Sequence, residues 1–282
     1  MSGLCDTVAA KRDELLRLLA SFGSCAVAYS GGVDSAVVAK AAHLALGNAA
    51  VVVTGVSPSL ADGELEQAHQ LAELIGVRHV ELSTNEIDNP DYASNPPDRC
   101  YYCKTELYGE LRDLAHKMGL AVLVNGANVD DMGEHRPGMM AAGEFGVRSP
   151  LTECGLTKEE IRQLAAEWQL PVADKPSMPC LSSRIAYGEQ VTPDRLRMVD
   201  DAEKLLRGLG LRNVRVRYHA GDVARIELPL QELCNCCEPI FRETLVEELR
   251  TLGFKYVTVD LEGFRSGSFT QLIPADSIGK LS

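Results

Sequence analysis

The sequence predicts an α/β protein with a parallel sheet in its first part and a smaller α+β domain after it. Strand-like and helical segments alternate through the first half of the chain, which is typical of a parallel sheet covered by helices on both faces. A glycine-rich turn follows the first strand-like segment. A long stretch rich in Pro and Ser then precedes shorter elements. We therefore expect two domains, residues 1–188 and 189–282.

Hydrophobic periodicity locates the elements of the first part. The predicted helices cover residues 6–20, 35–46, 62–75 and 106–118. The predicted strands cover residues 25–29, 50–54, 79–82 and 121–124. Asp62 is the expected N-cap of the third helix, because a carboxylate there accepts from the first free N–H groups.

Two irregular segments and the smaller domain complete the prediction. Residues 85–99 and 171–192 are rich in Pro with Asn, Asp or Ser, and long ordered loops of this kind are often functional. Beyond a boundary near Gly188 we expect a helix at 194–206, two strands around Arg217 and Ile226, a helix at 232–252 and a strand at 256–261.

Composition limits the function classes. The formal net charge of −12 repels nucleic-acid phosphates over most of the surface, so we expect no nucleic-acid partner. No apolar run approaches the roughly 20 residues of a membrane helix, and no signal pattern begins the chain, so we expect a cytoplasmic protein without membrane contact. Nine cysteines, an odd number, favour thiols or metal ligands over a complete disulfide framework.

The turn at residues 30–35 carries the strongest chemical signal. Two glycines let the backbone approach an anion, and the following helix directs free N–H groups and its positive dipole end at that anion. Two serines add hydroxyl donors. No Gly-Lys-Ser/Thr follows, so this is not the Walker loop. An ordinary glycine-rich strand–helix turn is the alternative. The candidate residues are Ser30, Gly31, Gly32, Asp34 and Ser35.

Two further loops leave predicted strands at residues 55–59 and 125–131. Ligands on parallel sheets lie at the carboxyl ends of the strands, so these loops should converge with the turn at 30–35. The second loop contains Asp130 and Asp131, which suit a metal or substrate positioning. A solvated acidic turn is the alternative interpretation.

Cysteines form two groups. Cys100 and Cys103 share a C-x-x-C motif at a predicted helix entry, and Cys180 lies in the second irregular segment. Zinc, an iron–sulfur cluster, redox chemistry, a nucleophilic thiol and inert packing are all open for these residues. Three thiolates with one open position suit a [4Fe–4S] cluster, since no fourth zinc ligand is evident. The other group consists of Cys234, Cys236 and Cys237. A continuous helix at 230–252 would place these three residues on different faces, which favours packing or surface thiols over a shared site.

The chain resembles a known family nearly end to end. The turn at 30–35 resembles the signature of the PP-loop ATP pyrophosphatases, which have a HUP-like nucleotide-binding domain. Further motifs lie at residues 125–131, 136–138, 149–151, 175–176, 179–185 and 260–268, of which the stretches at 179–185 and 260–268 are much more specific. Together they resemble the LarE family, the ATP-dependent sulfur transferases of nickel-pincer cofactor biosynthesis.

The resemblance implies the cofactors, the substrate and an oligomer. ATP would bind at the turn and at Gly55 and Gly126, with Mg²⁺ near Asp34 and Asp130. The substrate would be pyridinium-3,5-biscarboxylic acid mononucleotide, whose carboxylates are adenylated and then converted to thiocarboxylates. Sulfur would come from the cysteine at the Cys180 position, or from a [4Fe–4S] cluster on Cys100, Cys103 and Cys180, which the three cysteines favour.

Arginines are candidates to hold the phosphate or carboxylates of such a substrate, because guanidinium binds both in bidentate geometry. They are Arg184, Arg215, Arg217 and Arg265. Arg215 and Arg217 alternate along one predicted strand and so share a face. A solvated strand face is the alternative interpretation for this pair.

Three other functions remain open. A tRNA thiolase on the same ATP loop is disfavoured by the net charge. An amide-forming ligase would use ammonia and would not need Cys180. A non-catalytic nucleotide-binding module would release no AMP.

Overall fold

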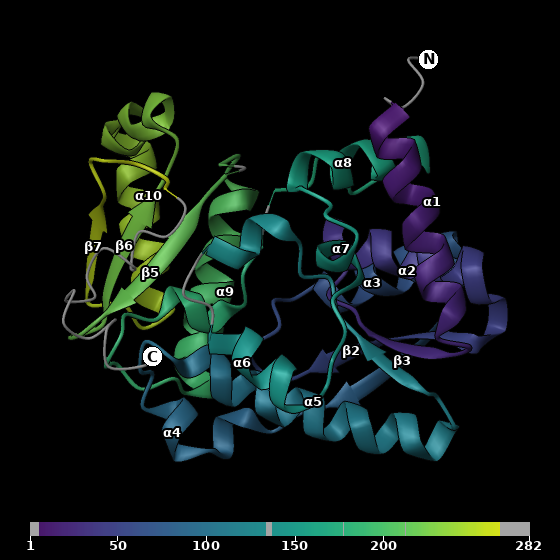
Figure 1. The fold of residues 1–282 in the computed structure, drawn as a ribbon. Helices are drawn as coiled ribbons and strands as arrows, with labels where there is room; N and C mark the ends of the chain where they lie inside the picture. The colour runs from purple at the N-terminus through teal and green to yellow at the C-terminus, as the bar shows by residue number, and fades with distance from the viewer. Residues whose placement is uncertain (1–5, 134–136, 177, 212, 266–282) are drawn as a thin grey trace. The chain divides into compact units, whose positions relative to one another are not determined.

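The chain forms two compact units in the computed structural model, which describes residues 6–133, 137–176, 178–211 and 213–265. The first unit comprises Met1–Glu86 and Cys100–Met178, and the second comprises Ile87–Arg99 and Pro179–Ser282 (Figure 1). The division therefore falls before the predicted boundary near Gly188. It also assigns most of the first predicted loop to the second unit.

A parallel four-stranded sheet forms the centre of the first unit, as predicted. Its strands are β1 (Cys25–Ala28), β2 (Ala50–Val56), β3 (Arg78–Ser83) and β4 (Val122–Val124), in the order β3-β2-β1-β4. In the register, Val27 of β1 lies between Val52 of β2 and Val124 of β4. The central strands are buried on both faces, which explains their continuous apolar sequences.

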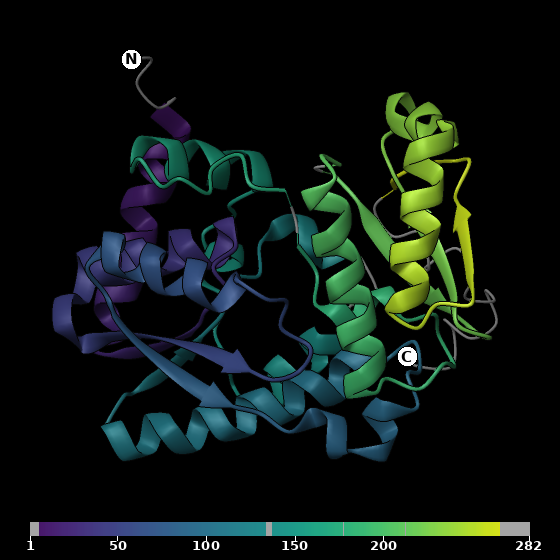
Figure 2. The ribbon, with the colours of Figure 1, turned by 180° about the vertical axis from the view of Figure 1, so that it is seen from behind.

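Helices cover both faces of this sheet (Figures 1 and 2). One core joins Leu15, Val37, Leu71 and Leu164, and the other joins Tyr108, Leu111 and Ala141. The first core belongs to α1 (Asp6–Ser21), α2 (Val33–Leu46), α3 (Glu64–Ile75) and α8 (Lys158–Glu167). The second belongs to α5 (Arg99–Met118) and α6 (Pro137–Glu144). The remaining short elements are η1 (Gly47–Ala49), η3 (Val129–Gly133) and α7 (Pro150–Glu153).

The starts of α5 and α3 differ from the prediction in ways that bear on the site. Helix α5 begins at Arg99 rather than at residue 106, so Cys100 and Cys103 lie within its first turns. The N-cap of helix α3 is Gly63 and not Asp62. The φ of Gly63 is 80°, which glycine adopts without strain because it has no Cβ. The predicted loop before α5 also contains η2 (Glu86–Asp88) and α4 (Pro90–Ala93).

The second unit has the expected α+β composition. Strand β5 (Arg215–His219) runs antiparallel to β6 (Val223–Glu227), and β7 (Tyr256–Val259) pairs parallel with β6. Besides α4, its helical elements are η4 (Leu181–Arg184), α9 (Pro193–Gly208), η5 (Leu230–Cys237) and α10 (Pro239–Thr251). Figure 1 labels this sheet and its helices.

The predicted continuous helix at 230–252 is wrong. Residues Leu230–Cys237 form a 3₁₀ helix, and α10 starts separately at Pro239. Proline has no N–H for a preceding carbonyl but suits the first turn of a new helix, so it separates the two elements. Within η5, Cys236 is buried, whereas Cys234 and Cys237 are exposed.

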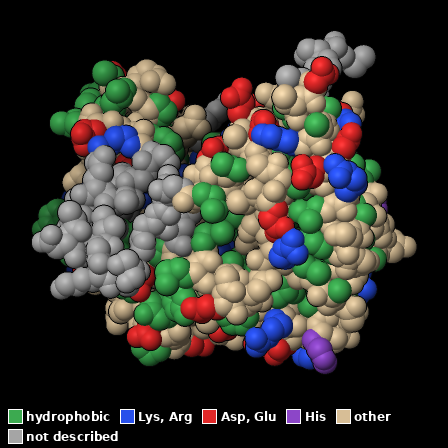
Figure 3. Space-filling view, viewed as in Figure 1, with side chains coloured by type: hydrophobic (Ala, Val, Ile, Leu, Met, Phe, Trp, Pro, Cys, Tyr) green, Lys and Arg blue, Asp and Glu red, His purple; other side chains and the backbone are tan. Residues whose placement is uncertain are grey.

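The described surface carries both signs of charge. Figure 3 shows Asp and Glu side chains interspersed with Lys and Arg over the described part of one face. Among the described residues, no helix combines the length and apolar character that a membrane crossing requires.

Candidate functional site

The glycine turn (residues 30–35) is a compact loop between β1 and α2. Ser30 donates its backbone N–H to the Ser35 hydroxyl at 3.2 Å, and that hydroxyl donates to the Gly32 carbonyl at 3.1 Å. Gly31 has a φ of 69°, a region that glycine adopts without strain. Gly32 is the N-cap of α2 and makes no side-chain capping bond. This geometry suits an anion, because the backbone N–H groups of a first helical turn lack partners inside the helix.

Gly126 contacts the glycine turn very closely from the loop after β4. A Cβ on Gly126 would lie 2.8 Å from the backbone nitrogen of Ser35, a distance that real Cβ atoms do not show. The absence of a side chain at Gly126 therefore lets two chain segments meet at the start of α2. Thus the structure joins two of the predicted loops at the carboxyl end of the sheet.

Asp34 forms an ion pair with Lys158, the first residue of α8. The Asp34 carboxylate also accepts from the Asn128 amide at 3.2 Å. Asp130 accepts from the backbone N–H of Lys158 at 2.8 Å. The two predicted magnesium ligands thus meet around one residue, Lys158, that the sequence prediction did not identify. Its ammonium group adds a cation beside the glycine turn.

The predicted Mg²⁺ fits these residues only as an ion that arrives with ATP. No group of three or more His, Cys, Asp or Glu side chains forms a metal centre within the described ranges. Mg²⁺ in nucleotide sites needs only one or two carboxylates, because phosphate oxygens and water supply the other ligands. Asp34 and Asp130 provide carboxylate oxygens of this kind.

Gly55 lies near the end of β2 against helix α5. A Cβ on Gly55 would lie 2.9 Å from a methyl group of Leu107. Its neighbour Thr54 is buried and donates its hydroxyl proton to the carbonyl of Tyr29, the residue before the glycine turn. The role of Gly55 in holding a nucleotide stays a prediction.

The three candidate sulfur-chemistry cysteines are divided between the two units. Cys100 is exposed and Cys103 half-buried in α5 of the first unit, whereas Cys180 is exposed in the second. Neither unit by itself therefore supplies the three thiolates of the predicted [4Fe–4S] cluster. Two other cysteines of the first unit are buried, and burial raises the pKa of Cys25 to about 12 and that of Cys154 to about 11.

A buried ion pair fixes the Cys180 turn (residues 179–185). Arg184 donates from Nε to one oxygen of Glu203 at 2.9 Å and from Nη2 to the other at 3.2 Å. The side chains are only 1% and 2% exposed. Arg184 Nη1 also donates to the carbonyl of Cys180 at 3.0 Å. These contacts therefore hold the Cys180 turn in place on α9, a role beyond the predicted one of substrate binding.

The segment 87–99 packs on the same turn from another part of the sequence. The Tyr92 and Ser182 hydroxyls lie 2.6 Å apart, and Asn95 donates to the carbonyl of Ala186 at 2.8 Å. Arg99 donates to the carbonyl of Ser182 at 2.8 Å. All these partners belong to the second unit. The Cys180 turn is thus held from two sides by side chains.

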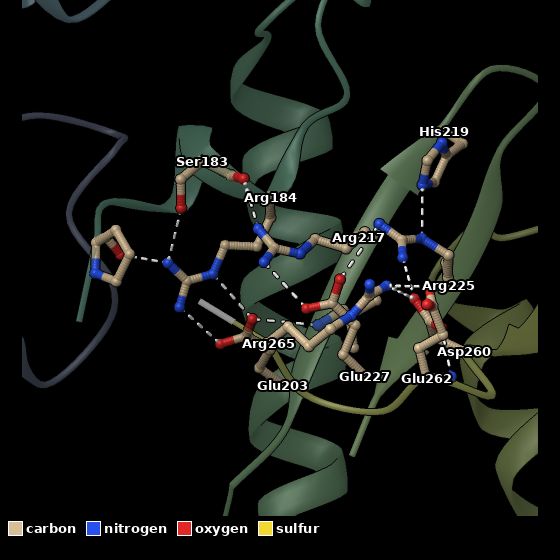
Figure 4. A network of polar contacts seen from close by, with 12 residues as sticks. Ser183, Arg184, Glu203, Arg217, His219, Arg225, Glu227, Asp260, Glu262 and Arg265 are labelled. Atoms are coloured by element: carbon tan, nitrogen blue, oxygen red, sulfur yellow. Dashed lines mark hydrogen bonds and ion pairs between the residues drawn. The ribbon is translucent and has the colours of Figure 1, made fainter. Parts of the chain in front are cut away.

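Figure 4 shows the polar network that continues from this turn across the sheet of the second unit. Arg217 pairs with Glu227 at 3.0 Å and donates to the carbonyl of Ser183 at 2.8 Å. Arg225 pairs with the other oxygen of Glu227 at 3.2 Å and also with Asp260. Arg265 reaches Glu262 at 2.6 Å and Asp260 at 3.5 Å. Three of the predicted arginines, Arg184, Arg217 and Arg265, therefore each pair with a carboxylate in this unit.

Burial changes the acid–base properties of this network. Burial lowers the pKa of Arg215 to about 10, and the charges of Arg184 and Arg217 contribute to the same shift. The Arg215 guanidinium lies 5.0 Å from the Phe264 ring centre. His219 has a lowered pKa, first because of burial and then because of Arg225, which donates to its Nε2 at 3.0 Å. Both strand arginines are buried, so the solvated-face interpretation of this pair is wrong.

Sequence reasoning missed two features of these sites. Lys158 was detectable, because Thr157 and Glu160 form a capping box, the Thr-x-x-Glu pattern that marks a helix start. The acidic partners Glu203 and Glu227 were not detectable, because pairing between distant segments leaves no local pattern.

Comparison with known proteins gives relatives over nearly the whole chain. No protein-family model matches. An uncharacterized protein of Synechocystis sp. is 44% identical over 263 residues, which cover 93% of this chain and 98% of the relative. The pyridinium-3,5-bisthiocarboxylic acid mononucleotide synthase of Lactiplantibacillus plantarum is 38% identical over 93% of this chain and 94% of its own length.

A more distant similarity is to part of an enzyme of nucleotide synthesis. One subunit of the glutamine-hydrolysing GMP synthase of Archaeoglobus fulgidus is 24% identical over 201 residues. These residues cover 65% of this chain and 64% of that relative.

Proposed function

Because the chain belongs to the LarE family of pyridinium-3,5-bisthiocarboxylic acid mononucleotide synthases, we propose that it is an ATP-dependent, AMP-forming sulfurtransferase. Its substrate would be pyridinium-3,5-biscarboxylic acid mononucleotide, and its product the corresponding thiocarboxylate. The observation that carries this proposal is the glycine turn against Gly126 and Lys158, which presents N–H groups and a cation to a polyphosphate.

ATP overcomes two chemical obstacles in this reaction. A carboxylate is a poor electrophile and repels an anionic sulfur nucleophile. When a carboxylate oxygen attacks the α-phosphorus of ATP, pyrophosphate leaves and an acyl-adenylate forms. A sulfur nucleophile then attacks the acyl carbon, and AMP leaves with the electron pair of the broken C–O bond. A second cycle converts the other carboxylate.

The residues of the first unit have assigned tasks in this proposal. The N–H groups at the start of α2 and the hydroxyls of Ser30 and Ser35 bind the departing pyrophosphate. Lys158 offsets its negative charge, and Asp34 orients Lys158 through their ion pair. Mg²⁺, when bound with ATP at Asp34 and Asp130, supplies further charge neutralisation.

In the second unit, Cys180 is the proposed sulfur-chemistry residue, because its thiol is exposed and its turn is held rigidly by Arg184 and Arg99. Arg215, Arg217 and Arg265 are the proposed contacts for the substrate phosphate and carboxylates. The [4Fe–4S] cluster on Cys100, Cys103 and Cys180 stays a prediction from sequence. Anaerobic purification followed by iron and sulfide analysis tests it. Iron-free protein whose Cys180 becomes lighter by the mass of H₂S after turnover would contradict it.

AMP release tests the proposed function. The full chain with Mg²⁺, ATP, the biscarboxylic acid mononucleotide and a sulfide source should form AMP and thiocarboxylate in equal amounts. Cys180→Ala should abolish the thiocarboxylate, whereas Cys237→Ala, an exposed thiol on η5, serves as the matched control and should retain activity. ADP in place of AMP, or no nucleotide cleavage, would refute the assignment.

An amide-forming ligase is the second candidate, favoured by the similarity to the GMP synthase subunit. Such an enzyme uses ammonia as the nucleophile and has no need of a thiol at position 180. Ammonia-dependent AMP formation that survives in Cys180→Ala would establish it.

We also propose that the protein acts in the cytoplasm as a homo-oligomer without a nucleic-acid partner. The negative net charge and the interspersed surface charges of Figure 3 support the absence of a nucleic-acid partner. Light scattering on the purified chain tests the oligomer. Copurification of tRNA would contradict the absence of a nucleic-acid partner.

A further inference from the structure

A continuous chain of polar groups connects the surface of the first unit to the base of the glycine turn. The Glu81 carboxylate lies 2.7 Å from His69 Nε2, and His69 Nδ1 lies 3.1 Å from His79 Nδ1. His79 Nε2 lies 2.8 Å from the Thr54 hydroxyl, which donates to the carbonyl of Tyr29 at 2.8 Å. Tyr29 immediately precedes Ser30, the first residue of the turn.

The hydrogen-bond directions in this chain follow from proton counting. Thr54 has a single hydroxyl proton and gives it to Tyr29, so Thr54 must accept from His79 Nε2–H. A neutral His79 then has a bare Nδ1, which must accept from His69 Nδ1–H. Glu81 is an acceptor when ionised, so His69 must also carry a proton on Nε2. The observed arrangement is complete only when His69 is an imidazolium.

Loss of that one extra proton to solvent reverses the chain. His69 then keeps its Nε2–H for Glu81, and its bare Nδ1 accepts from His79 Nδ1–H. The bare Nε2 of His79 now needs a donor, and the Thr54 hydroxyl is the group within reach. Thr54 therefore turns its proton from Tyr29 to His79, and the Tyr29 carbonyl loses its side-chain donor.

We propose that this chain is a proton-linked positioning device for nucleotide binding, in which His69 and His79 hold the glycine turn through Thr54. The inference rests on the proposed binding of ATP at that turn. The side chains of His69 and Glu81 are 40% and 50% exposed, so solvent protons reach them, whereas Thr54 is buried. Helix α3 also contacts the turn directly, since a Cβ on Gly31 would lie 3.4 Å from Ala68, the neighbour of His69.

The surroundings of His79 favour a neutral ring in both states. The titratable and charged groups that face it are His69 from α3, Glu81 from the same strand β3, and Tyr29 from the segment after β1. The ring centres of Tyr29 and His79 lie 5.6 Å apart. Burial lowers the pKa of His79, and the charge of His69 lowers it further, while Glu81 opposes them. Histidine side chains in general change charge between about pH 5 and pH 8, and this range sets the pH values of the test.

The Glu81→Gln variant distinguishes the effect of the hydrogen-bond chain from other effects of pH on the protein. The glutamine amide can donate to His69 Nε2, which completes every bond through to Tyr29 without an extra proton. The reversed chain would leave the Tyr29 carbonyl without its donor, so the variant should remain in the forward arrangement at all pH values. Glu110→Gln removes an exposed carboxylate from α5, a helix that contributes no residue to the hydrogen-bond chain, and is the matched control.

The test measures the Kd for MgATP of the full-length wild type and both variants between about pH 5 and pH 8. The titration of ATP itself changes the Kd of all three proteins equally. The ratio of wild-type to variant Kd therefore reports only the effect of protonation in the protein. For Glu81→Gln the ratio should rise from about one at low pH to about three- to tenfold at high pH, the effect of one hydrogen bond. For Glu110→Gln the ratio should stay constant. A constant ratio for Glu81→Gln would overturn the proposal.

Nitrogen NMR of the histidine rings gives a readout that does not depend on ATP. His79 should carry its proton on Nε2 at low pH and on Nδ1 at high pH in the wild type, and on Nε2 throughout in Glu81→Gln. One unchanged tautomer in the wild type overturns the device. Tautomer exchange in a protein that binds no ATP would instead refute the proposed function and its link to this chain.

Discussion

The glycine turn and the Cys180 turn achieve rigidity by opposite means. The glycine turn is built from backbone and small side chains, and its close contact with Gly126 depends on a missing Cβ. The Cys180 turn is held by long, buried, charged side chains, Arg184 with Glu203 above all. The first solution leaves the N–H groups of the first turn of α2 without partners inside the helix, whereas the second uses its side-chain donors for the protein itself. Changes at the first should therefore affect catalysis, and changes at the second should affect stability.

The largest expected effect is on the Cys180 turn. Arg184→Met removes the buried partner of Glu203, which then keeps the more exposed Arg207 at 3.4 Å, and should destabilise the protein by about 3 kcal/mol. Urea unfolding measures the change. Removing both charges in Arg184→Met/Glu203→Leu should restore most of the stability, and Arg197→Met, in an exposed pair with Asp194, should change it by less than about 1 kcal/mol. Equal losses in the single and double variants would disprove the buried-charge explanation.

The next effect concerns the glycine turn. Gly126→Ala places a Cβ against the Ser35 nitrogen and must displace the start of α2. A misplacement of about 1 Å can reduce catalysis about a hundredfold, so kcat/KM for ATP should fall by about ten- to a hundredfold. Gly143→Ala, where a Cβ meets nothing within 4 Å, is the control and should retain full activity. Unchanged kinetics in Gly126→Ala would remove the basis of the comparison.

A smaller effect is expected at the start of α8. Thr157→Ala removes one half of the capping box and should cost about 1 kcal/mol of stability. Because Lys158 follows directly and pairs with Asp34, the KM for ATP should rise as well. Thr251→Ala changes a threonine at the exposed end of α10 and should leave KM unaltered. A Thr157→Ala enzyme that loses stability with normal KM would separate Lys158 from nucleotide binding.

The smallest effect is a pH dependence in the second unit. Burial lowers the pKa of His219, so the unfolded chain takes up a proton near pH 6.5 before the folded protein does. His219 therefore contributes stability above about pH 6.5 that is lost as the pH falls. The urea midpoint of the wild type should decrease more than that of His219→Gln between neutral and mildly acidic pH. Parallel curves for the two proteins would contradict this assignment.

Sequence patterns predicted the first unit better than the second, for a physical reason. The alternation of apolar strands and amphipathic helices is local, and so are the glycines of the turn between β1 and α2. The start of α5 was misplaced because the Pro-rich segment before it conceals the helical periodicity of residues 99–105. The continuous helix predicted at 230–252 was wrong, although Pro239 is visible in the sequence. The prediction followed the apolar pattern of residues 230–252 and disregarded a proline, which does not fit the interior of a helix.

Long-range partners decided the remaining differences. Nothing near Arg184 in the sequence indicates Glu203, and nothing near Asn95 indicates that it reaches Ala186. The candidate arginines were named from the sequence as substrate contacts, but neither their carboxylate partners nor the placement of Arg184 in the same unit as the other three was identified. Chemistry was thus predictable where one short segment contains it, as in residues 30–35, and not where distant segments share it.

The path of the chain between its units has a practical consequence for dissecting the protein. The chain leaves the first unit after Glu86, returns after Arg99 and leaves again after Met178. A fragment that starts at Pro179 would lack Tyr92, Asn95 and Arg99, the side chains that hold its Cys180 turn. A single cleavage or truncation therefore cannot yield both halves intact. Independent expression of the second unit requires grafting residues 87–99 onto it through a new linker.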